Sequence, residues 1–295
     1  MTPRLFCFGL GYTAAHLGAV LAAEGWGVAG THRCRDGEPA PPSTAGVASL
    51  CFERGRRVST SALESANYLL ISIPPDELGD PVLDEHAASI AAIPELRWVG
   101  YLSTTGVYGN RDGDWVDEDA ELRPTGPRNR RRVAAEKAWL ELGQRHGLPV
   151  HVFRLAGIYG PGRSAVDTVR AGTARRVVKP GQVFSRTHVA DISSVLRASM
   201  VRPNPGAIYN VCDDDPAPPQ DVVAFACNLL GVPPPPEEPF DRARATMSEM
   251  ALSFYADSKR VANQRIKTEL GVRLLYPDYR AGLSAILAAE SGPGR

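Results

Sequence analysis

The chain has 295 residues, which is long enough for about two domains and a sizeable hydrophobic core. Hydrophobic residues make up 43% and charged residues 22% of the sequence, and this composition excludes a wholly disordered protein. The 33 basic and 33 acidic side chains cancel, so no net charge attracts the protein to nucleic acid or to an anionic membrane. We therefore expect no nucleic-acid or membrane partner.

The cysteines are odd in number and widely spaced, without a Cys-x-x-Cys pair: Cys7, Cys34, Cys51, Cys212 and Cys227. This pattern favours reduced thiols over a disulfide framework or a zinc site. The chain starts Met-Thr-Pro-Arg and runs straight into a strand-like segment, without a signal-peptide pattern. No stretch approaches the roughly 18 apolar residues of a membrane span. We expect a cytoplasmic protein.

Strand and helix patterns alternate over the first 160 residues. Short apolar runs predict buried strands at Leu5–Phe8, Trp26–Thr31, Val47–Phe52, Tyr68–Ile73, Trp98–Leu102 and Val150–Leu155. Helical spacing of apolar residues predicts helices between them, at 14–22, 60–66, 82–92 and 128–146. A Pro-rich loop at 38–42 stands where a further helix is expected. The alternation indicates an α/β protein with a doubly wound parallel sheet.

The pattern loosens after residue 160, where helices are predicted at 189–200 and 218–230 and a strand at 208–211. The Pro-rich segment 233–239 is interpreted as a stiff loop rather than as a docking motif. We expect residues 1–160 to form the Rossmann domain, rejoined by about 186–212, and residues 161–295 to form mostly a smaller substrate domain.

The segment Gly9-Leu10-Gly11-Tyr12-Thr13-Ala14 follows the first predicted strand and opens the first helix. It is the alanine variant of the Gly-x-Gly-x-x-Gly turn. Gly9 permits the tight turn, Gly11 lets a pyrophosphate approach the backbone, and Ala14 keeps the helix close to the strand. The free N–H groups at the start of the helix, including those of Tyr12 and Thr13, then meet the anion. The context predicts a dinucleotide site.

The end of the second strand indicates which dinucleotide binds. An NAD site usually carries Asp or Glu there, whereas this chain has Thr31-His32-Arg33-Cys34-Arg35. The Arg33 guanidinium suits a 2′-phosphate, which favours NADP(H) over NAD(H); the alternative is a solvated loop arginine. The remaining residues assigned to the cofactor site are Thr31, Ser72, Ile73, Pro74, Ser103 and Arg132.

Five motifs occur in a characteristic order: Gly9-x-Gly11, Ser103-Thr104-Thr105-Gly106-Val107-Tyr108-Gly109, Tyr159-Gly160-Pro161, His188-Val189-Ala190-Asp191 and Tyr209-Asn210-Val211. With them the chain resembles the extended short-chain dehydrogenases/reductases, the NAD(P)-dependent epimerase/dehydratase family. The resemblance implies a Rossmann domain, a smaller substrate domain and a homodimer. It also implies hydride exchange between nicotinamide and a carbinol carbon of a small molecule, often a nucleotide sugar.

The resemblance implies a Ser or Thr hydroxyl and a Tyr-x-x-x-Lys pair as the catalytic residues. Thr104 takes the hydroxyl position, but Arg128 and Arg132 stand where the tyrosine and lysine belong. Arginine supplies a fixed charge and cannot act as the acid. Tyr108 is the remaining catalytic candidate, although packing beneath the cofactor is favoured for it. Thr104 is either a contact to cofactor or substrate or a plain loop hydroxyl.

Two further patterns in the sequence are not assigned a catalytic role. Tyr255 and Lys259 match Tyr-x-x-x-Lys but lie in the presumed substrate domain, so we interpret the match as coincidence. Dehydratases of the family carry Asp-Glu after the threonine, whereas this chain has Thr105 and Gly106, which argues against simple dehydration.

The candidate substrate residues are Arg128, Arg163, Arg186 and His188. The basic run that begins at Arg128 is either an anion site or a solvated face of a helix. His188 is either a cleft residue or a helix cap, and Asp213–Asp215 is interpreted as a polar turn rather than a metal site.

Two hypotheses follow. The first is an atypical extended short-chain oxidoreductase or epimerase that binds NADP(H) and acts on a small, anionic carbonyl or sugar-like substrate. The alternative is a non-catalytic NADP(H)-binding sensor or scaffold, which the missing Tyr-x-x-x-Lys pair favours. A substrate-sized cavity over the C4 atom of the bound nicotinamide supports the enzyme, and a C4 face blocked by side chains supports the sensor.

Overall fold

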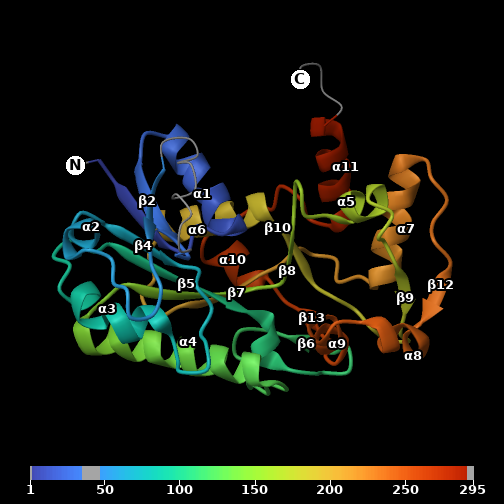
Figure 1. Cartoon of the computed structure of the whole chain (residues 1–295), viewed down its shortest axis with the longest axis horizontal. Helices are drawn as coiled ribbons and strands as arrows, with labels where there is room; N and C mark the ends of the chain where they lie inside the picture. Colours follow the sequence, from blue (N-terminus) through green and yellow to red (C-terminus); the bar gives the residue numbers. More distant parts are fainter. Residues whose placement is uncertain (1, 35–46, 291–295) are drawn as a thin grey trace.

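A seven-stranded parallel sheet forms the centre of the computed structural model, which describes residues 2–34 and 47–290 (Figure 1). Its strand order is β11-β7-β5-β4-β1-β2-β3. The strands are β1 (Arg4–Phe8), β2 (Gly27–His32), β3 (Ala48–Cys51), β4 (Tyr68–Ile71), β5 (Trp98–Thr104), β7 (Val150–Leu155) and β11 (Ile208–Val211). This is the doubly wound Rossmann arrangement, so the predicted fold class is confirmed.

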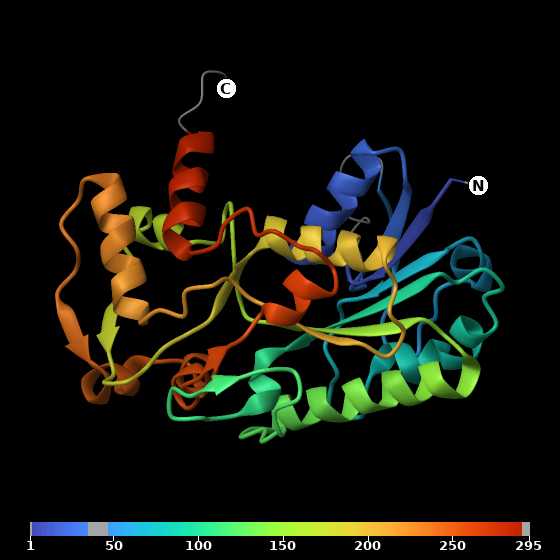
Figure 2. The same cartoon turned by 180° about the vertical axis from the view of Figure 1, so that it is seen from behind.

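Helices cover both faces of this sheet, which is why its central strands are apolar without alternation. On one face lie α1 (Tyr12–Ala23) and α6 (Val189–Val201), which contribute Leu17 and Leu196 to the core. On the other face lie α2 (Thr60–Glu64), α3 (Pro81–Ala91) and α4 (Pro127–His146), the long green helix along the lower edge of Figure 2. Trp139 of α4 is fully buried there.

Local signals fix the limits of these helices. Asp80 precedes α3, and its carboxylate accepts hydrogen bonds from the backbone N–H groups of Val82 and Leu83, at 2.9 and 3.1 Å. Gly147 ends α4 with a left-handed backbone, φ 67°, which glycine adopts without steric cost. Both helices therefore begin and end within one or two residues of the predicted limits.

A smaller lobe lies beyond the carboxyl ends of the strands (Figure 1). Helix α5 packs on α7, and α7 packs on α11 and β9. The elements of this lobe are β8 (Gly157–Tyr159), α5 (Ala165–Arg170), β9 (Arg176–Val178), β10 (Arg186–His188), α7 (Pro219–Leu230), β12 (Glu237–Pro239), α8 (Phe240–Ala243), η2 (Arg244–Thr246), α9 (Glu249–Tyr255) and α11 (Tyr279–Glu290). Between them the chain returns to the large sheet through α6 and β11.

The C-terminal part of the chain also ties the two lobes together. Strand β13 (Arg260–Val261) pairs in parallel with β6 (Trp115–Val116), in the segment that follows the 3-10 helix η1 (Thr105–Tyr108). Helix α10 (Gln264–Thr268) then packs beside β11. The short strands β6, β8, β9, β10, β12 and β13 had no distinct apolar pattern, because each has only two or three residues.

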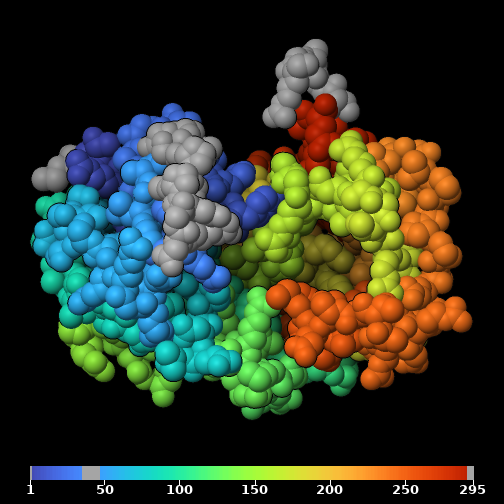
Figure 3. Space-filling view, viewed as in Figure 1, coloured from blue at the N-terminus to red at the C-terminus, as the bar shows by residue number. Residues whose placement is uncertain are grey.

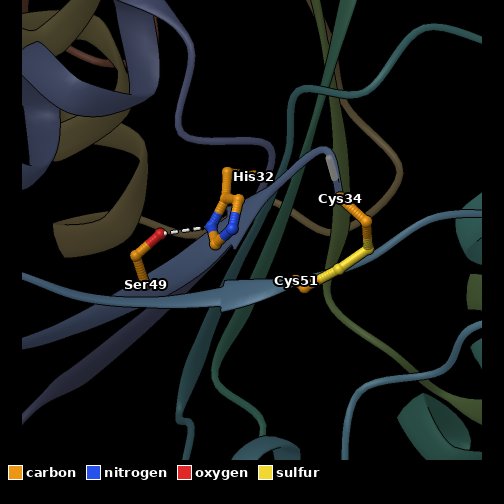
Figure 4. The surroundings of a disulfide bond; sticks show 4 residues. All are labelled: His32, Cys34, Ser49 and Cys51. Atoms are coloured by element: carbon orange, nitrogen blue, oxygen red, sulfur yellow. Dashed lines mark hydrogen bonds between the residues drawn. A yellow bond between two sulfur atoms is a disulfide. The ribbon is translucent and has the colours of Figure 1, made fainter. Parts of the chain in front are cut away.

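A disulfide joins Cys34, just after β2, to Cys51 at the end of β3 (Figure 4). The prediction of reduced thiols is therefore wrong for these two residues, while Cys7, Cys212 and Cys227 are free and buried. Spacing along the chain did not reveal the pair, because it forms through the parallel register that places His32 opposite Cys51. The two Cα atoms lie 5.1 Å apart, within the range that a disulfide spans.

The Pro-rich loop at 38–42 lies outside the described residues. Within residues 2–34 and 47–290, no helix is both long and apolar enough to cross a bilayer.

Candidate functional site

The turn between β1 and α1 has the backbone that the glycine motif predicted. Gly9 has φ +93°, and a Cβ there would lie 2.9 Å from Cγ1 of Ile73. A Cβ on Gly11 would meet nothing within 4 Å, so open space lies beside the first residue of the helix. The first turn of α1 carries no acidic side chain. The partial positive charge of the helix N-terminus is therefore available to a diphosphate.

Neighbouring side chains hold this turn. The N–H of Gly9 donates to Oγ1 of Thr31 at 2.9 Å, and the N–H of Leu10 donates to the Thr31 carbonyl at 2.7 Å. Thr31 is completely buried, so it positions the turn from behind rather than contacting a ribose. Thr13 and Ala14 are buried at the start of α1. The hydroxyl of Tyr12, the first residue of α1, contacts the Pro161 carbonyl.

The residues expected near the adenosine and the nicotinamide follow β2 and β4. Arg33 is exposed directly after β2, in contrast with the buried Thr31. Ser72, Ile73 and Pro74 follow β4 beside Gly9, and the N–H of Ser72 donates to the Phe8 carbonyl at 2.9 Å. Strands β1 and β4 flank the point where the strand order reverses, which is where dinucleotides bind in open α/β sheets.

Ser103 and Thr104, at the end of β5, face different surroundings. Ser103 is buried and donates its hydroxyl hydrogen bond to Glu136, so it does not present a donor to the cofactor as expected. Thr104 is half-buried, and its Oγ1 accepts a hydrogen bond from the N–H of Gly106 at 3.1 Å. Since the oxygen accepts, the Thr104 hydroxyl hydrogen is free to donate to a substrate.

Tyr108 lies in a buried polar network. Its hydroxyl donates to Oδ1 of Asn210 at 2.7 Å and accepts from Arg154 Nη1 at 2.9 Å. Arg154 in turn forms an ion pair with Glu136, at 2.8 Å, and both side chains are at least 96% buried. Burial raises the pKa of Tyr108 to about 12, although the charge of Arg154 acts in the opposite direction. A fully enclosed hydroxyl does not contact a substrate, so we withdraw Tyr108 as a catalytic residue.

The two arginines at the family's Tyr and Lys positions lie at the start of α4. Arg128 is exposed at the first turn. Arg132 is buried one turn later, where its Nη1 donates to the Leu102 carbonyl at 2.7 Å and to the Tyr101 hydroxyl at 3.1 Å. Arg132 thus places a fixed positive charge behind β5, next to the strand that ends in Thr104.

A cavity of about 430 Å³ lies in the small lobe between α5, α7 and α11. In the space-filling view, this lobe is hollowed between its yellow-green and orange segments (Figure 3). The residues that line it include Tyr159, Arg163, Asp167, Arg186, Pro219, Val222, Tyr279 and Leu283. Two of the four predicted substrate residues, Arg163 and Arg186, therefore lie together, whereas Arg128 and His188 do not line this cavity.

Tyr12 connects the cavity to the cofactor turn. The Arg163 guanidinium lies 5.6 Å from the centre of the Tyr12 ring, and the Tyr12 hydroxyl donates to the Pro161 carbonyl at 3.0 Å. Thr104 is not among the residues that line the cavity. The cavity is thus adjacent to the predicted diphosphate site and separate from Thr104, the predicted catalytic hydroxyl.

His188 caps α6, which was one of its two interpretations. Its Nδ1 accepts a hydrogen bond from the N–H of Ala190 at 3.2 Å, and its ring is packed against Tyr159 and Tyr276. Burial lowers the pKa of His188 to about 4, so the ring is neutral at pH 7. A buried neutral cap does not supply charge to a substrate, and we withdraw His188 from the substrate residues.

The segment Asp213–Asp215 is only partly a polar surface turn. Asp214 pairs with Lys267 at 2.5 Å and Asp215 pairs with Arg280 at 2.7 Å, both near the surface. Asp213, in contrast, is 2% exposed, and neither of its carboxylate oxygens has a hydrogen-bond partner among the described residues. Asp213 is therefore enclosed, whereas a run of three aspartates suggests an exposed turn.

The Tyr255–Lys259 match does not reproduce the catalytic helix of the family. Tyr255 is the last residue of α9, so the two side chains do not share a helix. Lys259 is buried, donates to the Gly109 carbonyl at 2.9 Å and lies 3.6 Å from Asp257. Its charge is used within the fold, in agreement with a coincidental match.

Some of the residues in and around the site were not predicted from the sequence. Arg154 is one of them, although a charged residue inside the largely apolar stretch 150–155 was a signal for a buried ion pair. Tyr279 was not singled out, and Tyr159 and Asp213 were noted only in a family motif and in a polar turn, because the three come together only through the packing of β8, β10 and α11.

Comparison with known proteins agrees with this geometry. A model of the NAD dependent epimerase/dehydratase family matches residues 86–212. Protein YeeZ of Escherichia coli strain K12 is 30% identical over 288 residues, which cover 92% of this chain and 95% of YeeZ. A 3-diazoavenalumate denitrifying reductase of a Streptomyces species is 25% identical over 248 residues, which cover 81% of this chain and 69% of the reductase.

A solved structure is more similar. It is that of a functionally unknown conserved protein from Silicibacter pomeroyi DSS, which is 51% identical and has a TM-score of 0.88. The match covers 99% of this chain and 100% of that one. The family's dependence on NAD agrees with the dinucleotide site predicted at Gly9. The chain belongs to the NAD-dependent epimerase/dehydratase family.

Proposed function

We propose that the protein is an NADP(H)-dependent oxidoreductase or epimerase that acts on a small anionic carbonyl or sugar-like molecule. The observation that carries the proposal is the turn at Gly9 and Gly11, with a free helix N-terminus on one side and the exposed Arg33 on the other. When bound, the cofactor supplies or accepts a hydride. The name of the Streptomyces relative, a reductase, supports the same class of reaction.

This chain's own residues then have distinct tasks. The N–H groups at the start of α1 bind the diphosphate, and Arg33 binds the 2′-phosphate. The Thr104 hydroxyl donates a hydrogen bond to the substrate oxygen and also holds a water molecule. This water exchanges a proton with the substrate, because the arginine at position 128 cannot supply one. Arg163 and Arg186 bind the anionic end of the substrate in the cavity, away from the reacting carbon.

Replacement of Arg33 tests the choice of cofactor. We expect Arg33→Ala to weaken NADPH binding about ten- to a hundredfold, because a charge-assisted hydrogen bond contributes about 1.5–3 kcal/mol. NADH affinity stays unchanged, since NADH lacks the 2′-phosphate. Dissociation constants from calorimetry check both values, with the exposed Arg56→Ala as the matched control. Equal affinities of the native protein for NADPH and NADH contradict the assignment.

A screen of NADPH oxidation across small carbonyl acids tests the reaction. With a substrate found, we expect Thr104→Ala to lower kcat by about 10²-fold, which is the typical effect of removing one positioned donor to a developing oxyanion. Thr268→Ala, on the exposed side of α10, leaves kcat unchanged. A Thr104→Ala enzyme with native kcat rules out the role given to this hydroxyl.

The enclosed hydroxyl of Tyr108 favours the second candidate function, a non-catalytic sensor or scaffold that binds NADP(H). Without an acid on α4 or at position 108, turnover depends on Thr104 and solvent alone. The same screen separates the two functions: tight NADPH binding without oxidation of NADPH by any carbonyl acid favours the sensor.

A further inference from the structure

Arg163, in the turn between β8 and α5, carries a positive charge that no acidic side chain balances. The residue is exposed, and within residues 2–34 and 47–290 its guanidinium forms no ion pair and donates no hydrogen bond. The acidic side chain four residues later, Asp167, is committed elsewhere, since its Oδ2 accepts from the N–H and the hydroxyl of Ser164 at 2.7 and 2.6 Å. The charge of Arg163 is therefore available to a ligand.

The turn that carries Arg163 is fixed against the Rossmann domain. Gly160 and Arg163 exchange two backbone hydrogen bonds, at 3.2 and 3.0 Å, and the Tyr12 hydroxyl donates to the Pro161 carbonyl at 3.0 Å. A Cβ on Gly160 would lie 2.5 Å from the Tyr12 hydroxyl oxygen and 2.7 Å from Cγ1 of Val189, so the turn approaches α1 and α6 as closely as glycine allows. In Figure 3 the yellow-green part of the small lobe adjoins the blue start of the chain.

The ring of Tyr12 shows where the charge of Arg163 lies. Tyr12 is the first residue of α1, and side chains on an α-helix lean toward the N-terminus of the helix. The Arg163 guanidinium lies 5.6 Å from the centre of this ring, and it is therefore close to the open end of α1. The helix has no capping side chain at Gly11 and no acidic residue in its first turn, so this end keeps its partial positive charge.

Two positive groups from different lobes thus lie close together. A cation beside a helix N-terminus is unfavourable, because the helix dipole repels it, unless an anion lies between the two. The diphosphate predicted at the turn between β1 and α1 carries its negative charge at this place. Arg163 is therefore placed to contact the same anion as the N–H groups of α1.

We propose that Arg163 binds the diphosphate of the nicotinamide dinucleotide from the side of the small lobe, so that the cofactor is held between the two lobes. A planar guanidinium suits this anion, because two of its N–H groups donate to two phosphate oxygens at once. The inference rests on the function proposed above, in which the turn at Gly9 binds the dinucleotide. It gives Arg163 a second ligand besides the substrate's anionic end.

Three probes separate this contact from the one assigned to Arg33. NADPH and NADH carry the diphosphate, whereas 2′-AMP carries the adenosine and a 2′-phosphate without it. We expect Arg163→Ala to weaken NADPH and NADH binding about tenfold to a hundredfold, because a charge-assisted hydrogen bond is lost. The affinity for 2′-AMP, measured by displacement of NADPH, stays unchanged. Arg33→Ala gives the opposite pattern: it weakens NADPH and 2′-AMP binding and leaves NADH binding unchanged.

The matched control is Arg170→Ala, in the adjoining helix α5, where Arg170 forms an ion pair with Glu290 instead. It leaves the affinity for all three probes unchanged. Arg163→Lys keeps the charge and loses the planar fork, so its affinity for NADH lies between those of the native protein and Arg163→Ala.

A measurement on the native protein does not depend on how the variants fold. Phenylglyoxal modifies accessible arginines, and mass spectrometry of the resulting peptides gives the rate at each residue. Saturating NADH should slow the modification of Arg163 several-fold and leave that of Arg170 unchanged. Saturating 2′-AMP should leave both rates unchanged.

Three results overturn the inference: native NADH affinity in Arg163→Ala, an equal loss of NADH and 2′-AMP affinity in that variant, or modification of Arg163 that NADH does not slow. Titration of the native protein keeps the two claims apart. Normal binding of NADPH and NADH together with any of these results overturns the role of Arg163 alone. A native protein that binds neither dinucleotide overturns the proposed function, and the role of Arg163 with it.

Discussion

Arg154→Met should lower the free energy of unfolding by about 3–5 kcal/mol, because it leaves Glu136 as a buried, uncompensated charge. Three Arg154–Glu136 contacts, at 2.8 to 3.2 Å, are lost together with the donors that Arg154 gives to the Tyr108 hydroxyl and the Glu118 carbonyl. Denaturant unfolding followed by circular dichroism measures the change.

The matched control is Arg123→Ala, which removes an ion pair with Glu121 whose side chains are 59% and 69% exposed. We expect this variant to change the free energy of unfolding by no more than about 1 kcal/mol, as for other exposed ion pairs. Replacing both buried partners, in Glu136→Leu with Arg154→Met, recovers most of the lost stability because no charge then remains unpaired. Equal losses for Arg154→Met and Arg123→Ala contradict the structure of this network.

The features that the sequence predicted well depend on local patterns. Leu5–Phe8 is apolar at every position because the strand is covered on both faces, and Gly9 after it adopts the positive φ of the tight turn. The dinucleotide turn, the sheet class and the long helix that starts at Pro127 therefore followed from residues close together in the chain.

The features that the sequence did not predict depend on contacts between distant segments. The sequence favoured packing beneath the cofactor for Tyr108, but it did not show that Asn210, 102 residues later, accepts the hydrogen bond of the Tyr108 hydroxyl in a closed network. The N–H of Asp213 donates to the carbonyl of Arg186, on a strand that no local pattern placed beside it. Composition and spacing report exposure on average, and they do not report which polar side chain a particular fold encloses.

The site therefore has two parts of different origin. The proposed cofactor part is built on backbone: a glycine turn, a helix N-terminus and the hydrogen bonds of Thr31. The proposed substrate part is built on side chains from the small lobe, with Arg163 linking the two across the Tyr12 ring. A backbone site follows from motif residues alone, whereas a side-chain site depends on the packing of the helices around it.

Reduction of the Cys34–Cys51 disulfide should lower the free energy of unfolding by about 3 kcal/mol. The bond closes a loop with a sequence separation of 17 residues, and closure of a loop of this size restricts the unfolded chain by about that amount. The paired strand ends remain joined without it, since their ladder and the hydrogen bond between His32 and Ser49, at 2.7 Å, persist (Figure 4). The loss therefore comes from the unfolded state.

Urea unfolding with and without dithiothreitol measures this effect. The matched variant is Cys51→Ser, which should unfold at the midpoint of the reduced native protein and show no response to dithiothreitol. Because Cys7, Cys212 and Cys227 are free and buried, the reductant breaks no other bond between the described cysteines. A native midpoint that dithiothreitol leaves unchanged shows that the two thiols are not joined, and then the prediction of reduced cysteines from their spacing holds for the whole set.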